Sequence, residues 1–333
     1  MKNKNFAVLI GVLVILIAIY LFQQLNTGKK SISESMINVF PDLKASSVSA
    51  IKVYKQDYPD SGLSFVKKDG AWLISSYFNA PAKENDIDKL LSDIKTLQGE
   101  VRSTKAELFD DYDIADSIAL HVELLRPDSS ELVHMLVGKG VPQASKSSFV
   151  RKFNADTVYI ANQNFLSRFA VWNAEPAKKM PSKRWAEMKM TDVDKELVIS
   201  FEIKAKRKLY RFEKKQVPTE DTTAPPKYIW EQIKPKKGKI LEDKDIQPIL
   251  NRIVTFNSQE IINDEILKEY GLTKPKYSVS FTTVDGKSTI VSFGNAIDTT
   301  SNAYYTSVDN KPFVYKVAKY NFESIFVNPF KDD

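Results

Sequence analysis

The sequence predicts an α+β fold: an N-terminal transmembrane helix followed by two tandem copies of a domain that combines an antiparallel sheet with a helix. Three observations predict it. An uncharged apolar run lies near the N-terminus, a pattern of residues recurs later in the chain, and several segments alternate apolar and polar residues as half-buried strands do. The 333 residues, 43% hydrophobic and 27% charged, are enough for two globular domains.

The apolar run extends from Phe6 to Phe22 without a charge. Its length is near the lower limit for a helix that crosses a bilayer. A cleaved signal peptide is the alternative, because Lys2 and Lys4 precede the run, but no small-residue cleavage site follows it. The chain has no cysteine for lipid attachment. We therefore expect a cytoplasmic tail, a retained signal anchor that spans the membrane, and a linker (residues 1–5, 6–25 and 26–39).

The orientation of this span follows from the length of the segment after it. The lysines on its two sides nearly balance, so the positive-inside rule decides little, and long downstream segments are exported largely regardless of charge. We expect a single-pass protein of the cytoplasmic (inner) membrane whose C-terminal body is extracytoplasmic.

An internal repeat organises the body. Asp86 precedes apolar residues spaced as on one face of a helix, and Asp245 precedes the same spacing. The apolar residues are Ile87, Leu90, Leu91, Ile94 and Leu97 in the first copy and Ile246, Ile249, Leu250, Ile253 and Phe256 in the second. Each Asp is expected to cap its helix, and Pro248 is expected in the first turn, where its missing N–H costs no bond.

Residues on both sides of the helix keep their order and almost their spacing. The matching pairs are Trp72 and Trp230, Tyr112 and Tyr270, Gly138 and Gly294, and Tyr159 and Tyr315. Small loop insertions in a duplicated domain produce this pattern, so we expect a first repeat over 40–180 and a second over 181–333. The polar, proline-rich stretch from Lys214 to Lys227 is expected to be an exposed loop of the second copy.

Each copy is predicted to follow one plan. An opening hairpin leads to a strand that carries a buried Trp, through the Asp69-Gly70 turn in the first copy, and then to the helix. A second hairpin follows, with Asp285-Gly286 as its turn in the second copy, and then a further strand pair and a short helix. The predicted segments are Ala50–Tyr54, Leu63–Val66, Asp69–Trp72, Ile118–Leu124, Ser148–Arg151, Thr157–Ala161 and Phe165–Val171 in the first copy, and Leu197–Ile203, Leu209–Phe212, Tyr277–Phe281, Tyr304–Ser307, Phe313–Lys316 and Phe322–Phe326 in the second.

The sequence lacks the common motifs of nucleotide binding and catalysis, so we predict no catalytic and no cofactor-binding residues. The two histidines are His121 and His134. If the turn between their strands centres on Pro127–Ser130, His134 faces either His121 or Glu123, which allows a His, Glu, His metal site. The second copy has no histidine, and a cross-strand polar pair is the commoner outcome, so no metal is expected.

Charged groups elsewhere have simpler explanations. The group Asp110, Asp111, Asp113 and Asp116 lacks the residue order of a calcium loop and is interpreted as a solvated turn. Gly138 and Gly140 are also interpreted as a turn. The basic tracts at residues 204–208 and 234–239 have the charge to contact phosphates or lipid head groups, but solvated turns are the default interpretation. Nucleic acid is not expected as a partner outside the cytoplasm.

The repeat carries a family resemblance. The carriers are Phe40-Pro41-Asp42-Leu43, Ile51-Lys52-Val53, Asp69-Gly70-Ala71-Trp72, Pro81-Ala82, Tyr270-Gly271-Leu272, and Gly294 followed by Tyr304 and Tyr315. In these residues the chain resembles the bacterial family described as domain of unknown function 4340. The first copy departs at Tyr112-Asp113-Ile114, where Tyr-Gly-Leu is expected, so the geometry of that turn is open.

The resemblance implies a signal-anchored, periplasmic protein encoded beside gliding-motility-type ABC transporter components, and it supplies no catalytic residues. We therefore expect a membrane-anchored extracytoplasmic binding or scaffolding protein, an accessory component of an ABC-type transport system. Its expected partners are the membrane, through residues 6–25, and transporter subunits. The alternative is an envelope-acting enzyme with a site of dispersed carboxylates.

Overall fold

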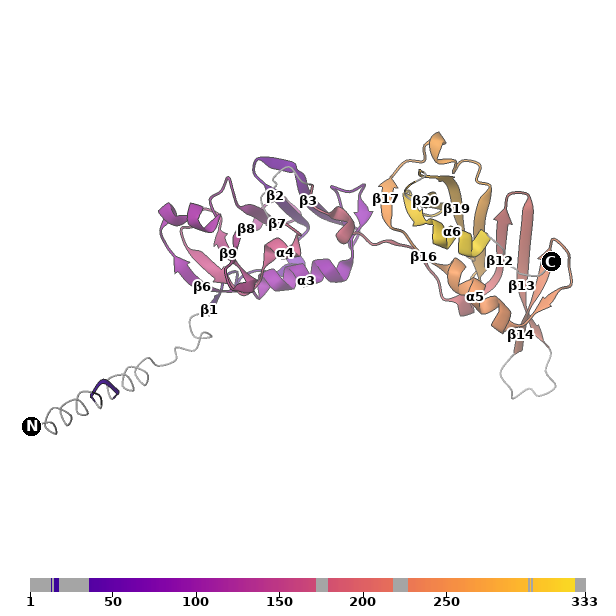
Figure 1. The fold of residues 1–333 in the computed structure, drawn as a ribbon, viewed down its shortest axis with the longest axis horizontal. Coiled ribbons are helices and arrows are strands. Elements are labelled where there is room, and N and C mark those ends of the chain that lie inside the picture. The colour runs from indigo at the N-terminus through magenta and orange to yellow at the C-terminus, as the bar shows by residue number, and fades with distance from the viewer. Residues whose placement is uncertain are drawn as a thin grey trace, which may run out of the picture. The chain divides into compact units, whose positions relative to one another are not determined.

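The computed structural model describes residues 13, 15–17, 36–171, 179–217, 227–298, 300 and 302–326, and these form mostly β-sheet with few helices (Figure 1). The predicted anchor at residues 6–25 lies outside the described residues except for 13 and 15–17, and the tail 1–5 lies outside them entirely. None of the helices that the structure describes is long and apolar enough to cross a membrane.

The first sheet has ten strands within the described residues, in the order β1-β6-β10-β9-β8-β7-β2-β3-β4-β5. The strands are β1 (Met36–Asn38), β2 (Ala50–Lys55), β3 (Tyr58–Lys68), β4 (Ala71–Ile74), β5 (Ala80–Pro81), β6 (Gln98–Ser103), β7 (Leu120–Leu125), β8 (Glu131–Val141), β9 (Ala144–Lys152) and β10 (Val158–Ala161). Around it lie the helices α3 (Glu84–Lys95) and α4 (Phe165–Arg168) and the 3-10 turns η1 (Ala45–Ser47), η2 (Ala106–Leu108) and η3 (Asp110–Tyr112).

The second sheet has nine strands in the described part of the chain, in the order β15-β14-β13-β12-β18-β19-β20-β21-β17. The strands are β12 (Val198–Ala205), β13 (Lys208–Val217), β14 (Lys227–Lys234), β15 (Ile240–Leu241), β17 (Glu260–Asn263), β18 (Tyr277–Thr283), β19 (Ser288–Ala296), β20 (Ala303–Val308) and β21 (Val314–Ala318). A separate pair joins β11 (Lys189–Asp192) to β16 (Thr255–Asn257), and the helical elements are α5 (Asp243–Val254), α6 (Lys319–Phe326), η4 (Ser182–Arg184), η5 (Lys195–Leu197) and η6 (Lys268–Tyr270).

The chain forms two compact units. One comprises the described residues up to Leu73 together with Glu84–Pro181, and the other comprises Ile74–Lys83 together with the described residues from Ser182 onward. The predicted division into 40–180 and 181–333 assigns Ile74–Lys83 to the first part, whereas the contacts of this segment group it with the second unit.

Hydrogen bonds hold the segment Ile74–Lys83 in the second unit. The hydroxyl of Tyr77 donates to the carbonyl of Ile261 at 2.7 Å and accepts from the N–H of the same residue at 2.9 Å. The N–H of Glu187 donates to the carbonyl of Pro81 at 2.8 Å. Backbone groups of the segment therefore depend on residues far along the chain.

The helix stripes predicted from the sequence are mostly buried, but Ile249 is half-buried, and Leu97 and Phe256 lie after the ends of the helices. Ile87, Leu90, Leu91 and Ile94 of α3 are at most 4% exposed, and Ile246, Leu250 and Ile253 of α5 at most 1%. Burying each such side chain stabilises the fold by roughly 1.5–3 kcal/mol relative to leaving it in water. Trp72 and Trp230 are also buried, as predicted for core residues.

Both helices begin earlier than the sequence predicted. α3 begins at Glu84 and α5 at Asp243, so Asp86 and Asp245 lie inside the first turn and do not cap it. Carboxylates there still interact favourably with the positive end of the helix dipole. Pro248 is consequently beyond the first turn, inside α5, and the predicted position of this proline was wrong.

Several strand boundaries also differ from the prediction. β13 continues to Val217 and β14 starts at Lys227, whose backbones pair, so the ends of the predicted loop are strand, and residues 218–226 lie outside the described residues. Ile118 precedes β7 and is 40% exposed instead of sharing its buried face. The sequence did not predict β6 or β17, because their polar residues hide the strand pattern.

The two sheets share a strand order. From β6 the first sheet runs β6-β10-β9-β8-β7-β2-β3-β4-β5, and the second, read backwards, runs β17-β21-β20-β19-β18-β12-β13-β14-β15. In both units, the helix that bears the buried stripe comes directly after the short edge strand in the chain: α3 follows β5, and α5 follows β15. β1 is the additional strand of the first sheet.

A close backbone approach recurs in both sheets. A Cβ built on Gly138 of β8 would lie less than 3.0 Å from the carbonyl oxygen of Tyr112, and one on Gly294 of β19 less than 3.0 Å from that of Tyr270. The two glycines are therefore strand residues against which a carbonyl packs. These positions require glycine for lack of space. Gly140 also lies in β8, so the predicted turn at Gly138 and Gly140 was wrong.

The residue after each of these tyrosines adopts the left-handed conformation. Asp113 has φ 51° and Gly271 has φ 69°, each at the end of a 3-10 turn. The turn that departs from the family pattern in sequence therefore has the same backbone geometry as its counterpart. Aspartate is one of the few residues other than glycine that tolerate this conformation.

Candidate functional site

A cluster of polar side chains lies on one face of the first sheet. Side chains alternate between the faces of a strand, so Val122 and Leu124 of β7 face one side and His121 and Glu123 the other. On the neighbouring strand β8, His134 pairs directly with Glu123. The three candidate residues predicted from the sequence therefore do share a face, and His134 lies opposite Glu123, diagonal to His121.

The polar face is covered, so these groups are inside the protein. Residues 109–119 fold over it and contribute to a small apolar cluster with β8, β9 and β10 whose buried members are Ile114, Ala119, Leu136, Phe149 and Val158. Beside this cluster His121 is 3% and His134 9% exposed. Each ring has a stacked aromatic neighbour: Tyr54 stacks on His121 with 4.9 Å between centroids, and Phe153 stacks on His134 at 4.1 Å.

The ring nitrogens of both histidines are occupied by protein partners. Nδ1 of His121 lies 2.9 Å from Nε2 of His134, and Nε2 of His121 lies 2.7 Å from the carbonyl oxygen of Asp116. Nδ1 of His134 lies 3.2 Å from Oε2 of Glu131. Nε2 of His134 also lies 3.9 Å from Oε1 of Glu123.

Donor and acceptor requirements fix the direction of these bonds. The Asp116 carbonyl can only accept, so Nε2 of His121 carries a proton and donates it. In the neutral ring Nδ1 of His121 then accepts, and Nε2 of His134 is the donor between the rings. If His134 is neutral, its Nδ1 has no proton to donate to Glu131. If His134 is protonated, it donates to both His121 and Glu131.

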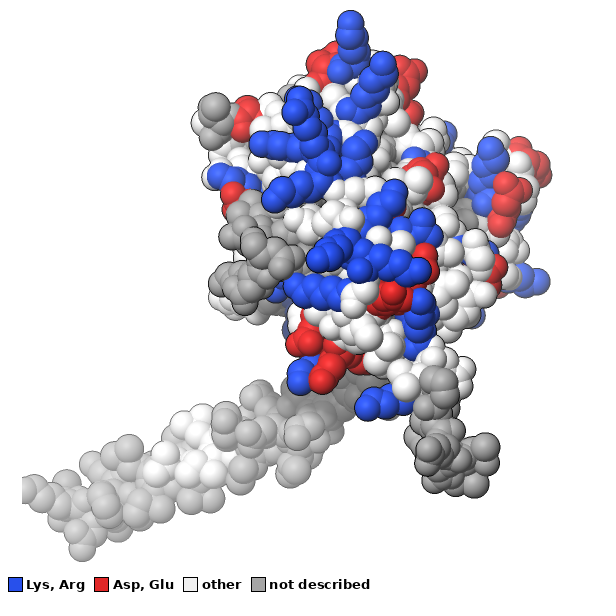
Figure 2. Space-filling view, turned by 90° about the vertical axis from the view of Figure 1, so that its right-hand side faces the viewer, with Lys and Arg blue, Asp and Glu red and all other residues white. Residues whose placement is uncertain are grey.

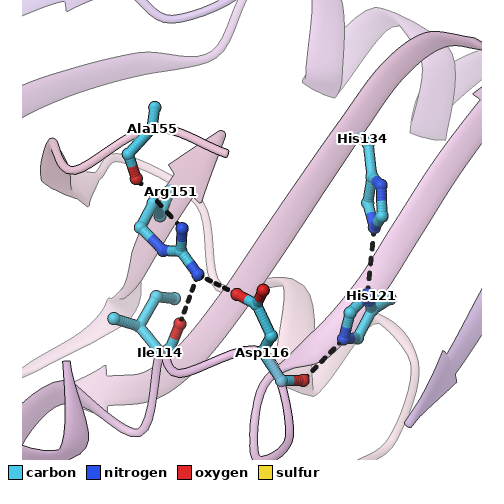
Figure 3. A network of polar contacts seen from close by, with 6 residues as sticks. All are labelled: Ile114, Asp116, His121, His134, Arg151 and Ala155. Atoms are coloured by element: carbon cyan, nitrogen blue, oxygen red, sulfur yellow. Dashed lines mark hydrogen bonds and ion pairs between the residues drawn. The ribbon is translucent and has the colours of Figure 1, made fainter. Parts of the chain in front are cut away.

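Asp116 connects this series of hydrogen bonds to a buried arginine (Figure 3). The guanidinium of Arg151 on β9 forms an ion pair with the Asp116 carboxylate and donates to the carbonyls of Ala155 at 3.0 Å and Ile114 at 3.2 Å. It also lies over the ring of Phe109, 4.3 Å from its centroid. Arg151 thus fastens the covering segment to the sheet, and Asp116, predicted to be part of a solvated turn, is one of the groups that hold it.

The pKa shifts in the cluster follow from burial. Burial lowers the pKa of His121, and the hydrogen bond to the Asp116 carbonyl opposes this less strongly. Burial raises the pKa of Tyr54, and its hydrogen bond to Glu123 raises it further, so the phenol keeps its proton and donates to the carboxylate. Both shifts favour neutral side chains.

The cluster has the contacts of a structural network. Within the described ranges, no group of three or more His, Cys, Asp or Glu side chains is arranged to hold a metal ion. The nitrogens of His121 and His134 that would bind one already contact each other, Asp116 and Glu131. Tyr54, Asp116 and Arg151 were not recognised as its members from the sequence.

A pocket of about 220 Å³ opens elsewhere in the first unit. Its apolar lining comes from the ends of β7 and β8 and from Leu166 and Val171, and its charged lining residues are Lys55, Lys139 and Asp113. Sites for drug-sized ligands have about 300–1,000 Å³, so this pocket has room for a small group only.

The comparisons with known proteins identify the family. A family model described as Domain of unknown function (DUF4340) matches residues 72–275. The chain belongs to the DUF4340 family. No curated protein and no solved structure matches it.

The DUF4340 match does not follow the unit boundaries. It begins in β4 and ends just before β18, so it includes parts of both units. Asp116, His121, His134 and Arg151 lie inside the match and Tyr54 lies before it. The family description assigns no activity, so the function must be inferred from the geometry of the chain itself.

Proposed function

We propose that this DUF4340 chain is a membrane-anchored extracytoplasmic binding or scaffolding protein that acts as an accessory component of an ABC-type transport system. The observation that carries the proposal is that the side chains of its polar cluster have partners within the protein. His121, His134 and Arg151 lie beneath a covering segment and bond to one another, to Asp116 of that segment or to its backbone. Such a network stabilises the sheet. We assign binding to the surface of the protein.

We further propose that the two units are tandem copies of one domain. The shared strand order and the repeated packing of a tyrosine carbonyl on a strand glycine support this. Since such close approaches depend on the whole local fold, two of them at matching positions favour duplication over coincidence. Duplication would give the protein two related surfaces on one chain.

The anchor and the transporter belong to the proposal as well. An apolar span formed by residues 6–25 in the cytoplasmic membrane, with the body outside, would keep the body close to membrane partners. The effective concentration of the body near those partners would rise, so that a weak interface suffices. The association with transporter subunits is drawn from the family resemblance and is an analogy.

Cross-linking in native membranes followed by purification of the full chain tests the proposal. ABC transporter subunits should be recovered with the wild type and with His121→Ala/His134→Ala, whereas deletion of residues 6–25 should reduce their recovery. Recovery that is unchanged by the deletion would contradict the anchoring role. Turnover of an envelope substrate by the purified chain, abolished by changing one or two carboxylates, would replace binding by the enzymatic alternative.

A further inference from the structure

Three chain segments meet at one end of the second sheet. The turn between β12 and β13 adjoins the segment before β18, since the N–H of Lys206 donates to the carbonyl of Lys276 at 2.7 Å. On its other side β13 pairs with β14, with Arg211 opposite Lys234, so the residues that follow β14 lie beside the start of β13. Neighbouring strands are about 4.8 Å apart, so these segments form one continuous tip.

This tip, the basic end, carries only positive charge. Residues 203–210, 232–241 and 273–277 contain no Asp or Glu. Their basic residues are Lys204, Lys206, Arg207, Lys208, Lys234, Lys236, Lys237, Lys239, Lys274 and Lys276, and all of them are exposed. The formal charge of the whole chain is +6, so the rest of the chain is net acidic once these ten are set aside.

Two contacts at the basic end involve its lysines. The ammonium of Lys204 donates to the carbonyl of Pro275 at 3.2 Å, a contact that keeps its charge. Glu231 is a nearby carboxylate whose pKa is lowered first by its bond to Lys215 and, at longer range, by Lys237. In Figure 2 Lys and Arg side chains gather over one part of the face shown, with few carboxylates between them.

We propose that the basic end docks on the anionic phosphate head groups of a lipid membrane. This inference rests on the proposed membrane attachment, which holds the body near such a surface. Nine of the ten cations are lysines. Their flexible point charges suit mobile head groups, whereas arginine offers a rigid fork for fixed planar partners. Ile240, 60% exposed directly after Lys239, adds an apolar side chain of the kind that enters the interface.

Nucleic acid is the competing partner and fits less well. Sequence-tolerant binding of single strands combines cations with stacking aromatic rings, and duplex readout inserts a helix or ribbon into a groove, often with arginine. The exposed cations of the basic end are nine lysines and one arginine, on the ends of strands and the turns between them. A tip of this kind matches a charged surface better than a groove.

The test measures hydrogen–deuterium exchange of the full chain reconstituted in nanodiscs of phosphatidylcholine alone or with phosphatidylglycerol. Peptides that cover 203–210, 232–241 and 273–277 should exchange several-fold more slowly in the anionic discs, and 0.5 M salt should remove the difference. Reversal of three charges, Lys206→Glu/Arg207→Glu/Lys208→Glu, should abolish it, because each basic residue near an anionic surface contributes roughly a fivefold factor in binding.

Lys68→Glu/Lys146→Glu/Lys183→Glu is the matched control, since it reverses three exposed lysines outside these segments and should preserve the protection. Equal exchange in both discs, or equal loss in both variants, would overturn the docking proposal. Stronger protection by a DNA duplex at the same salt would assign the surface to nucleic acid instead. Failure of the wild type to float with phosphatidylcholine vesicles would instead refute the anchor, and charge-dependent flotation with anionic vesicles would still test the basic end.

Discussion

Replacing Gly138 with alanine tests the close backbone approach in the first unit. The new Cβ would lie less than 3.0 Å from the Tyr112 carbonyl oxygen and 3.0 Å from Cδ1 of Ile114. The oxygen belongs to the backbone of a 3-10 turn, so it cannot rotate away as a side chain would. The turn has to shift, and the apolar cluster that includes Ile114 shifts with it.

Overpacking of this kind costs about 1–3 kcal/mol, and we expect Gly138→Ala to lie in the upper half of that range because the obstacle is backbone. Gly140→Ala is the matched control two residues along the same strand. Its Cβ would meet the Asn164 amide nitrogen at 3.7 Å and the Ser147 carbonyl at 3.8 Å, which are ordinary contacts. The control should change stability by less than about 1 kcal/mol.

Native-state hydrogen exchange of peptides from β7, β8 and β9 measures the free energy of opening of this region in both variants. Gly138→Ala should lower it and Gly140→Ala should not. If the two variants agree within error, the carbonyl does not restrict position 138 and the reasoning fails. Gly294→Ala should have the same effect on β18 and β19, because the Tyr270 carbonyl packs there in the same way.

Two further predictions concern the polar cluster, and a third concerns the left-handed residue Asp113. Burial lowers the pKa of His121, so as the pH falls through the ordinary histidine range the unfolded chain takes up a proton that the folded chain does not. Stability therefore falls as the pH drops, and in urea unfolding the wild type should lose more stability than His121→Gln on going to acidic pH. Asp116→Asn should cost about 2 kcal/mol, because the buried Arg151 loses its charged partner while the carbonyl bond to His121 stays, and exchange of residues 109–119 should rise. Asp113→Gly should be tolerated and Asp113→Val should cost about 1–2 kcal/mol, as measured by denaturation, since only the valine resists positive φ.

Local patterns in the sequence predicted much of the fold. The apolar spacing gave α3 and α5, and the Asp-Gly pairs at 69–70 and 285–286 mark turns with Gly70 and Gly286 at positive φ. These features depend on neighbours in the chain. The helix starts were misplaced because acidic residues occupy several positions of each first turn, and a carboxylate there does not by itself mark the cap.

The parts that depend on tertiary structure could not be predicted. Strand alternation placed His121, Glu123 and His134 on one face, but Arg151 joins them only because residues 109–119 fold back over the sheet. The same applies to Gly138, whose restriction comes from the carbonyl of Tyr112. Nothing in the local sequence records such contacts.

The segment Ile74–Lys83 has a consequence for the order in which the protein is made. Tyr77 leaves the ribosome 184 residues before Ile261, the backbone partner of its hydroxyl. At about 5–20 residues per second, that partner arrives roughly 10–40 s later. During this interval the first part of the chain can begin to fold, while ten residues in its middle await a unit that has not yet been translated. A nascent chain released at Pro181 would therefore contain a piece of the second unit without the residues that complete it.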